Sequence, residues 1–443
     1  MREVMLTEGS IFGGLLRFSL PMIGGNLLQQ VYNLTDTLIV GRYLGSDALG
    51  AVGSVYTLMT FLTSILIGLC MGSGAFFSAD YGAREQDRLR EDIRLSFRFI
   101  FVVSVLISAA VYPATGLILS LLRTPPELMD MTKSYVSVAF GGLMFLFLYN
   151  FFAYLLRAMG NSVVPLIFLG VSTVMNIGLD IWFVVGLELG VAGAAWATVL
   201  AQAAAGIGIA LYVLGKIPLL RTPMPEAPTP GRLRQIIAGD VATGIQQSVM
   251  NFGILMIQGL VNSFGAVIMA AFAAAVKIDT IAYMPAQEFG NAYSLFVSQN
   301  SGAGKPERVK QGTKVAFGTA TGFCLVSSAV IFAFAGALMG LFLAPGETEI
   351  LAEGVRYLRI EGAMYVGIGI LFLWYGYFRG IGKPRVSLLL TVISLGTRVV
   401  LAYALAPRTP LGVTAIWLAI PIGWGLADLA GLALYRKQDG GKP

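Results

Sequence analysis

The sequence predicts an all-α membrane protein of twelve transmembrane helices, arranged in two six-helix lobes. Of its 443 residues, 56% are hydrophobic and only 12% are charged, whereas a soluble domain carries about 25% charged residues. Apolar runs of roughly 20 residues, long enough to cross a bilayer, recur along the whole chain. Motifs of the first half return in the second half, which indicates an internal repeat.

Six apolar runs precede a proline-rich stretch, and six follow it. The first six spans are expected at 15–40, 48–77, 93–120, 131–157, 162–186 and 190–214. The second six are expected at 236–262, 265–298, 314–343, 352–378, 385–406 and 411–435. Several runs are longer than the hydrocarbon core is thick, which indicates tilt or extension beyond the membrane.

The proline-rich stretch 215–234 reads GKIPLLRTPMPEAPTPGRLR. Proline removes backbone donors and resists helix formation, so this stretch is expected outside the bilayer. It divides the chain into an N-terminal lobe (1–214), a cytoplasmic linker (215–234) and a C-terminal lobe (235–443).

Lysine and arginine cluster in alternate connections, at 82–98, 304–314, 379–385 and 436–442. The positive-inside rule then places both termini in the cytoplasm of a multi-pass protein of the inner membrane. The net charge of +6 is therefore explained by topology, and no nucleic-acid partner is expected.

The internal repeat is visible at matching offsets. Leu156–Gly160 resembles Phe378–Gly382 at an offset of 222 residues, and Gly190 corresponds to Gly412 at the same offset. Six spans per repeat is an even number, so both copies insert in the same orientation. The two lobes are therefore expected to be related by a pseudo-two-fold axis along the membrane normal.

Two acidic residues lie inside apolar runs of the first half, Asp36 and Asp180. A charged carboxylate at the bilayer centre costs about 2.5–3.5 kcal/mol, so such residues usually mark ion or substrate pathways. Gln29, Asn33 and Asp36 fall three to four residues apart and share one helical face, as do Asn176 and Asp180. The alternative is that these groups only join helices by hydrogen bonds.

If these helices pack together, the two carboxylates share one poorly hydrated pocket. Burial and mutual repulsion disfavour two charges there, so one carboxyl is expected to hold a proton near neutral pH. A cation could replace that proton, with Asn176 and Thr198 supplying neutral oxygen ligands. The candidate ion site is therefore Asp36, Asn176, Asp180 and Thr198, and it takes H⁺ or Na⁺.

The second half breaks the symmetry, because Asp180 corresponds to Ala402. It carries other charges inside its apolar runs, which form a candidate polar network: Lys277, Asp279, Glu288 and Arg398. Asp279 is a candidate partner of Arg398, whereas Lys277, two residues away from Asp279, does not face it on a helix. Glu361, near a span end, is expected at the membrane interface. The alternative is a neutralised structural network.

Several classes of function are not supported. The chain has no histidine and two cysteines, both in apolar segments, so no structural metal site or disulfide is predicted. It contains no GxxxxGK[ST] motif, so ATP-driven transport is unsupported. No catalytic constellation is present, and the protein is not expected to be an enzyme or to need a cofactor beyond a coupling ion.

With these residues the chain resembles the multidrug and toxic compound extrusion (MATE) family over nearly its whole length. The motifs that carry the resemblance are Leu20-Pro21 with Asn26 and Gln29, Asp36, Tyr81-Gly82-Ala83, Arg157–Asn161, Asn176 with Asp180, Gly193–Thr198, Lys277-Ile278-Asp279, Met284–Asn291 and Gln299–Gly304. The resemblance implies two six-helix lobes, a central cavity and export of organic cations or amphipathic compounds in exchange for Na⁺ or H⁺. It implies that Asp36, Asn176, Asp180 and Thr198 match the family's first-lobe ion site. It also implies that Pro21 matches the proline around which the first helix is proposed to bend.

The sequence therefore favours a secondary active antiporter that works as a monomer on small cationic or amphipathic compounds. The alternative is a flippase for lipids or lipid-linked oligosaccharides, built on a related repeated plan. A flippase for anionic head groups should carry basic residues in its spans, and this chain has few. A channel is disfavoured because no charged ring or filter motif repeats.

Overall fold

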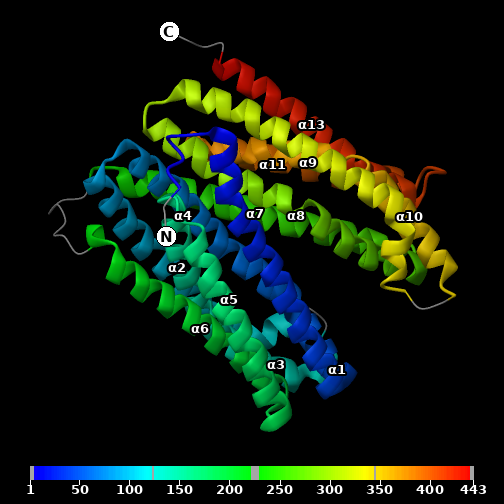
Figure 1. Cartoon of the computed structure of the whole chain (residues 1–443). Coiled ribbons are helices and arrows are strands. Elements are labelled where there is room, and N and C mark those ends of the chain that lie inside the picture. Colours follow the sequence, from blue (N-terminus) through cyan, green and yellow to red (C-terminus); the bar gives the residue numbers. More distant parts are fainter. Residues whose placement is uncertain (1–3, 122–123, 221–228, 344–345, 440–443) are drawn as a thin grey trace. The chain divides into compact units, whose positions relative to one another are not determined.

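The computed structural model describes residues 4–121, 124–220, 229–343 and 346–439, and within these ranges it is helical without any strand (Figure 1). The helices of the first half are α1 (Ile11–Ala83), α2 (Gln86–Leu121), α3 (Pro126–Gly141), α4 (Leu143–Ala158), α5 (Val163–Asp180) and α6 (Gly190–Lys216). A π-helix (Ile181–Gly186) follows α5, and a short 3₁₀-helix (Pro218–Leu220) follows α6.

The second half has seven helices in the described ranges. They are α7 (Arg232–Asn262), α8 (Ala266–Gly302), α9 (Pro306–Gly340), α10 (Thr348–Gly362), α11 (Tyr365–Gly380), α12 (Pro384–Leu405) and α13 (Val413–Asp439). Proline occupies the first helical position of α3, α9 and α12. Its missing amide proton costs nothing there, because the first amides of a helix have no intrahelical acceptor.

The chain forms two compact units. The first contains 1–5 and 20–244, and the second contains 6–19 and 245–443. Two helices therefore contribute to both units: α1 passes from the second to the first at Leu20, and α7 passes from the first to the second at Ile245. Pro21 follows the first of these crossings directly. Since proline cannot donate to the carbonyl of Arg17, α1 has a local weak point next to that crossing.

The hydropathy of the helices assigns the protein to the membrane, although not every expected span is a helix apolar enough to be identified as a membrane span. α1 is broken at Gly45 (φ 86°), so it counts as two helices, Ile11–Gly45 and Asp47–Ala83, whereas α3 and α4 count together as one. On this basis the described residues contain ten helices long and apolar enough to cross a bilayer, or eleven if α10 and α11, bent by 51° at their junction, form one broken span. The span expected at 236–262 corresponds to α7, which does not count among them. Its polar side chains, including Asp240, Thr243 and Gln246, lower the hydropathy of this helix, and they are buried within the protein.

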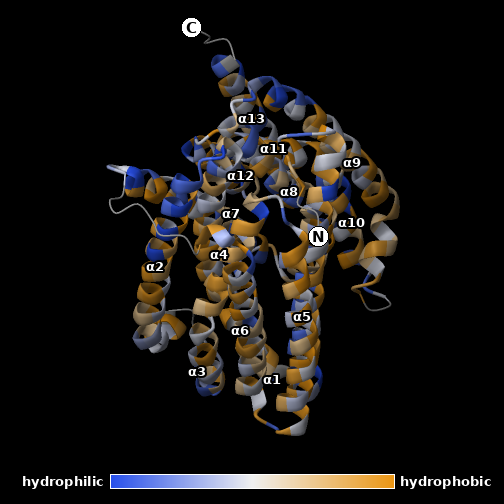
Figure 2. Cartoon of the chain, turned by 60° about the vertical axis from the view of Figure 1, so that its left-hand side comes forward, coloured by the Kyte–Doolittle hydropathy of each residue, from blue (hydrophilic) through white to orange (hydrophobic). Residues whose placement is uncertain are grey.

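Figure 2 shows apolar residues along most of the length of α5 and α6. Many large apolar side chains on these helices are exposed in the protein alone, among them Val174, Trp196 and Leu211. Lipid is the medium that covers such side chains. The protein is thus a multi-pass membrane protein.

Equivalent turns of the two halves share an unusual backbone conformation. Gly160 and Gly382, the last residues of the equivalent RAMG and RGIG sequences, have φ of 87° and 75°. Left-handed φ values are open to glycine because it has no Cβ. At the next such pair, Arg84 (φ 61°) stands where the second half has Gly304 (φ 65°). The repeat detected in the sequence therefore extends to local backbone geometry.

Within the first unit, α6 contacts α3, α4 and α5, and within the second unit α8 contacts α9, α10 and α11. Small residues allow the closest approaches. A Cβ at Gly376 on α11 would lie 2.5 Å from the carbonyl oxygen of Gly290 on α8. Of the expected linker 215–234, residues 221–228 lie outside the described ranges, while α6 ends at Lys216 and α7 begins at Arg232.

Candidate ion-binding site

The first unit brings residues from three helices to one place. Asp36 lies on α1, Asn176 and Asp180 lie on α5, and Thr198 lies on α6. The carboxylates of Asp36 and Asp180 are close enough to interact electrostatically. The arrangement arises because α5 packs along α6, while the Tyr32 hydroxyl of α1 donates a 3.0 Å hydrogen bond to Thr198 Oγ1.

Several polar side-chain atoms of Asp36, Asn176 and Asp180 are buried and unpaired. Asn176 and Asp180 are fully buried, and Asp36 is half-buried. Asp36 Oδ1, both carboxylate oxygens of Asp180 and both polar side-chain atoms of Asn176 have no hydrogen-bond partner among the described residues. Leaving buried polar groups unpaired is costly. A cluster of such atoms therefore indicates a place where something binds.

The unpaired atoms fit a proton or a small hard cation. Four of them are oxygens, contributed by two carboxylates and one amide, and Thr198 adds a hydroxyl nearby. Oxygen ligands of this kind suit hard cations. No group of three or more His, Cys, Asp or Glu side chains able to hold a metal occurs in the described part of the chain, so a transition metal has no ligand set there.

Two tyrosines also face the carboxylates. Tyr32, one turn before Asp36 on α1, and Tyr135 on α3 each interact electrostatically with both Asp36 and Asp180. Sequence reasoning missed both tyrosines. Tyr32 lies four residues from Asp36, so helical spacing could have placed it on the same face. Nothing in the sequence pattern pointed to Tyr135.

An apolar cluster lies one turn from the site on each helix. Ile39 and Val40 of α1 pack with Val184 of the π-helix and with Val191 and Ala194 of α6, and all five are buried. Because these side chains exclude water on that side, charges in the site interact more strongly than they would in water.

Asp180 is the last residue of α5, and the π-helix begins at the next residue. There the Leu187 amide bonds to the carbonyl of Trp182, five residues earlier. Single π-turns inside helices frequently mark functional sites. The irregular turn thus supports the assignment of Asp180 as a functional residue.

Of the polar residues expected on one face of α1, only some have buried side chains. Gln29 is exposed and Asn33 is half-buried. Neither side chain has a hydrogen-bond partner among the described residues, although the Asn33 carbonyl accepts a bond from Thr37 Oγ1. The structure therefore groups Asp36, Asn176, Asp180 and Thr198, and it does not join Gln29 or Asn33 to them.

The second unit contains a buried polar network that differs in part from the expected one. Asp279 and Arg398 are both buried, and they interact electrostatically without an ion pair in the described part of the unit. Tyr357 donates a 3.5 Å hydrogen bond to Asp279 Oδ2. Glu361 is 2% exposed beside them. The expectation that Glu361 is interfacial was therefore wrong, because α10 turns this side chain toward α8.

The remaining charges of the expected network lie elsewhere. Lys277 is exposed, as its two-residue separation from Asp279 predicts. Glu288 belongs to a different chain of contacts, in which Asn291 Nδ2 donates to Glu288 Oε1 at 3.3 Å. The Asn291 oxygen in turn accepts a 3.0 Å bond from Arg379, whose Nε donates to Ser294 Oγ at 3.0 Å.

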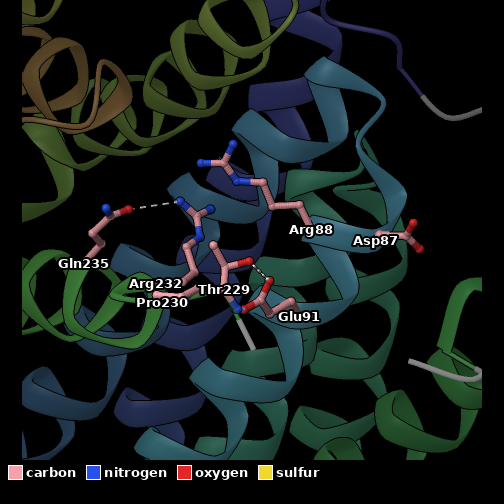
Figure 3. Close-up of a pocket in the computed structure, with 7 residues that line it drawn as sticks. All are labelled: Asp87, Arg88, Glu91, Thr229, Pro230, Arg232 and Gln235. Carbon is pink, nitrogen blue, oxygen red and sulfur yellow. Dashed lines mark hydrogen bonds between the residues drawn. The ribbon is translucent and has the colours of Figure 1, made fainter. Parts of the chain in front are cut away.

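A third polar cluster joins the start of α7 to α1 and α2, at the rim of a pocket of about 450 Å³ (Figure 3). Arg232 Nε donates to Asp92 Oδ1 at 2.7 Å, and its Nη2 contacts Asp80 Oδ2 at 3.1 Å. All three side chains are buried. Burial alone lowers the pKa of Arg232, but the carboxylates outweigh burial and raise this pKa above its usual value. The guanidinium is therefore charged at every physiological pH.

Further along α7, Asp240 Oδ2 accepts a 2.6 Å hydrogen bond from Ser73 Oγ of α1, and both residues are fully buried. Sequence reasoning missed this acid and the Arg232 cluster. Asp240 lay inside an expected span, so the criterion that singled out Asp36 and Asp180 could have found it.

The sequence is similar to known proteins over nearly the whole chain. Residues 21–182 and 242–404 match the MatE family model. The probable multidrug resistance protein YpnP of Bacillus subtilis is 30% identical over 438 residues, which cover 98% of this chain and 97% of that protein. The multidrug export protein MepA of Staphylococcus aureus is 22% identical, over 98% of this chain and 95% of that protein.

Solved structures share the fold. A crystal structure of MATE in the bent conformation aligns with a TM-score of 0.91 and 24% identity, over 99% of this chain and 97% of the other. A crystal structure of MATE in the straight conformation aligns with a TM-score of 0.89, over 99% of this chain and 98% of the other. At this level of identity the likeness concerns the fold alone.

Proposed function

The chain belongs to the MatE family, and we propose that it is a secondary active antiporter that exports organic cations or other amphipathic compounds in exchange for H⁺ or Na⁺. The names of its relatives as multidrug resistance and export proteins support multidrug efflux. The observation that carries the proposal is the pair of neighbouring carboxylates Asp36 and Asp180, which interact electrostatically and carry unpaired buried oxygens, with Asn176 one turn before Asp180 on α5.

The chemistry of the pair suits ion exchange. Two carboxylates that share a dry pocket are stabilised when a proton or a cation neutralises one of them. Asn176 and Thr198 would then act as neutral oxygen ligands and Tyr135 as a hydroxyl donor, while the single O–H of Tyr32 is donated to Thr198. An ion that enters from outside would bind here and be released to the cytoplasm.

Coupling requires that the ion and the exported compound bind different conformations of the protein. The proposed moving element is α1. Pro21 removes one backbone hydrogen bond of this helix, and the Tyr32–Thr198 hydrogen bond holds the helix to α6. Protonation turns a carboxylate oxygen from an acceptor into a donor, so it would change the hydrogen bonds that α1 can make near Asp36.

We further propose that the protein is a monomer of the cytoplasmic membrane with both termini in the cytoplasm. The basic residues at 82–98, 304–314 and 436–442 support this orientation. Both native cysteines, Cys70 and Cys324, are buried. A cysteine introduced at the exposed Arg234 would therefore report the side of the membrane on which the linker end lies.

The decisive experiment is efflux of a fluorescent organic cation from proteoliposomes, with Na⁺ and pH gradients imposed separately. The proposal expects efflux to depend on one of the two gradients. Efflux that is indifferent to both gradients, or gradient-independent movement of a labelled lipid between leaflets, would contradict an antiporter and favour a flippase.

A further inference from the structure

The second unit contains a groove that no part of the proposed ion site uses. It has a volume of about 600 Å³ and lies between α9, α11 and α13, of which α11 packs against both of the others. Its apolar lining includes Phe317, Ile370, Trp374, Ile422, Leu426 and Leu432. Pockets that hold drug-sized molecules have volumes of roughly 300–1,000 Å³ and mostly apolar walls.

One carboxylate faces this apolar lining. Asp428 on α13 is the only charged residue among the described residues that line the groove. Its Oδ1 atom is buried, and its side chain has neither a hydrogen bond nor an ion pair in the described part of the chain. A carboxylate in apolar surroundings without a partner is costly. A positive charge or a hydrogen-bond donor bound in the groove would therefore stabilise the Asp428 carboxylate.

Aromatic rings form a rigid wall beside Asp428. The rings of Phe317 and Trp374 have centroids 4.7 Å apart and are inclined at 65°, and the Trp374 ring also contacts the Tyr435 ring at 5.5 Å. Trp374 is 4% exposed, and its indole nitrogen has no hydrogen-bond partner among the described residues. Aromatic faces attract cations, and the attraction is larger in desolvated sites.

We propose that this groove, hereafter the Asp428 groove, is a binding site for a lipophilic organic cation. The positive charge lies against the Asp428 carboxylate, and the apolar substituents lie against Trp374, Phe317 and the leucine side chains of α13. Charge complementarity favours this occupant. A neutral acyl chain would leave the carboxylate unpaired, and an anionic head group would be repelled by it. The site goes beyond the proposed ion exchange, because it shares no residue with the Asp36–Asp180 pair.

Gly425 provides a way to fill the groove without disturbing the fold. It lines the groove, and a Cβ added there would meet nothing within 4 Å. Gly425→Phe should therefore occupy the binding volume without a backbone clash. Gly396 on α12 is equally open and does not line the groove, so Gly396→Phe is the matched control.

The test is equilibrium binding of radiolabelled tetraphenylphosphonium to the full-length protein in lipid nanodiscs, with no ion gradient. The wild type and Gly396→Phe should bind with the same affinity and stoichiometry. Asp428→Asn should weaken one class of site at least tenfold, and Gly425→Phe should abolish that class.

Three outcomes would overturn the proposal. One is unchanged binding in both Asp428→Asn and Gly425→Phe. Another is loss in Asp428→Asn with full binding in Gly425→Phe, which would locate the cation elsewhere. The third is release of a co-purified phospholipid by Gly425→Phe without any change in cation binding, which would assign the groove to lipid. Because no transport is measured, these outcomes do not depend on whether the antiport proposal holds.

Discussion

The hydroxyl of Tyr32 donates a 3.0 Å hydrogen bond to Thr198 Oγ1, which joins α1 to α6 across 166 positions of the sequence. Tyr32 lies one helical turn before Asp36, and it interacts electrostatically with both Asp36 and Asp180. Any movement of this part of α1 away from α6 must break the bond. The contact therefore links the position of the first helix to the state of the carboxylate pair.

The first prediction concerns this bond. Tyr32→Phe removes the hydroxyl and keeps the ring, so it should lower stability by about 1 kcal/mol, the usual net value of one hydrogen bond. It should also weaken the conformational response of α1 to the coupling ion. Thermal unfolding and spin-label distances within the first unit would measure both effects. Tyr43→Phe, at an exposed position of α1, is the control. Equal behaviour of the two variants would remove Tyr32 from the mechanism.

The second prediction concerns the carboxylates. Asp36→Asn and Asp180→Asn should each reduce ion-driven efflux to the level of empty liposomes, because an amide can neither release a proton nor neutralise a cation. Folding should remain intact, since each change removes an unpaired charge from a dry site. Asp130→Asn, at an exposed acid on α3, is the matched control. Wild-type efflux by a well-expressed double variant would exclude the pair as the coupling site.

The third prediction concerns pH. Acidification should protonate the carboxylate pair and change the conformation of α1, and Pro21→Ala should weaken this response by restoring the backbone hydrogen bond that proline removes. Spin-label distances between α1 and α5, measured from about pH 5 to 8 without Na⁺ or substrate, would test it. Distances that do not change over this range would count against protons and leave Na⁺ as the coupling ion.

The fourth prediction concerns the start of α7. Arg232→Met leaves Asp92 buried without its cationic partner, while Asp80 keeps only Arg88, whose Nε lies 3.4 Å from Asp80 Oδ1. Breaking a buried ion pair in this way costs about 3–5 kcal/mol. The melting temperature of the purified protein should fall sharply. Arg234→Met, at an exposed position of α7, should have little effect. Adding Asp92→Asn to Arg232→Met should recover part of the loss, and a further drop in the double variant would refute the assigned pairing.

The fifth prediction concerns the contact between α1 and α7. A Cβ at Gly72 would lie 2.7 Å from Asp240 Cα and 2.8 Å from its Oδ1, so Gly72→Ala must move backbone as well as a side chain. Overpacking of this kind costs about 1–3 kcal/mol. Gly53→Ala, on the same helix with nothing within 4 Å of the added Cβ, should be neutral or stabilising. A Gly72→Ala variant as stable as the wild type would mean that α7 can shift at Asp240 without loss of stability.

Local sequence patterns predicted the membrane class, the internal repeat and part of the candidate site. Hydropathy identified the membrane class, and matching offsets identified the repeat, whose turns at Gly160 and Gly382 share their backbone conformation. An acid in an apolar run is conspicuous, so Asp36 and Asp180 could be singled out, and helical spacing placed Asn176 beside Asp180. Hydropathy was a weaker guide to α7, where Asp240 and Gln246 are buried by other helices.

The sequence by itself determined that this chain is a repeated bundle of membrane helices with two isolated carboxylates in its first half, because hydropathy, helical period and offset are properties of neighbouring or equivalent positions. Only the tertiary structure decided that Tyr135 faces those carboxylates, that Glu361 is buried beside Asp279, and that Arg232 pairs with Asp92 from 140 residues away. Such contacts depend on how each helix is rotated and inclined against its neighbours. That geometry results from the packing of many side chains at once, and no local pattern encodes it.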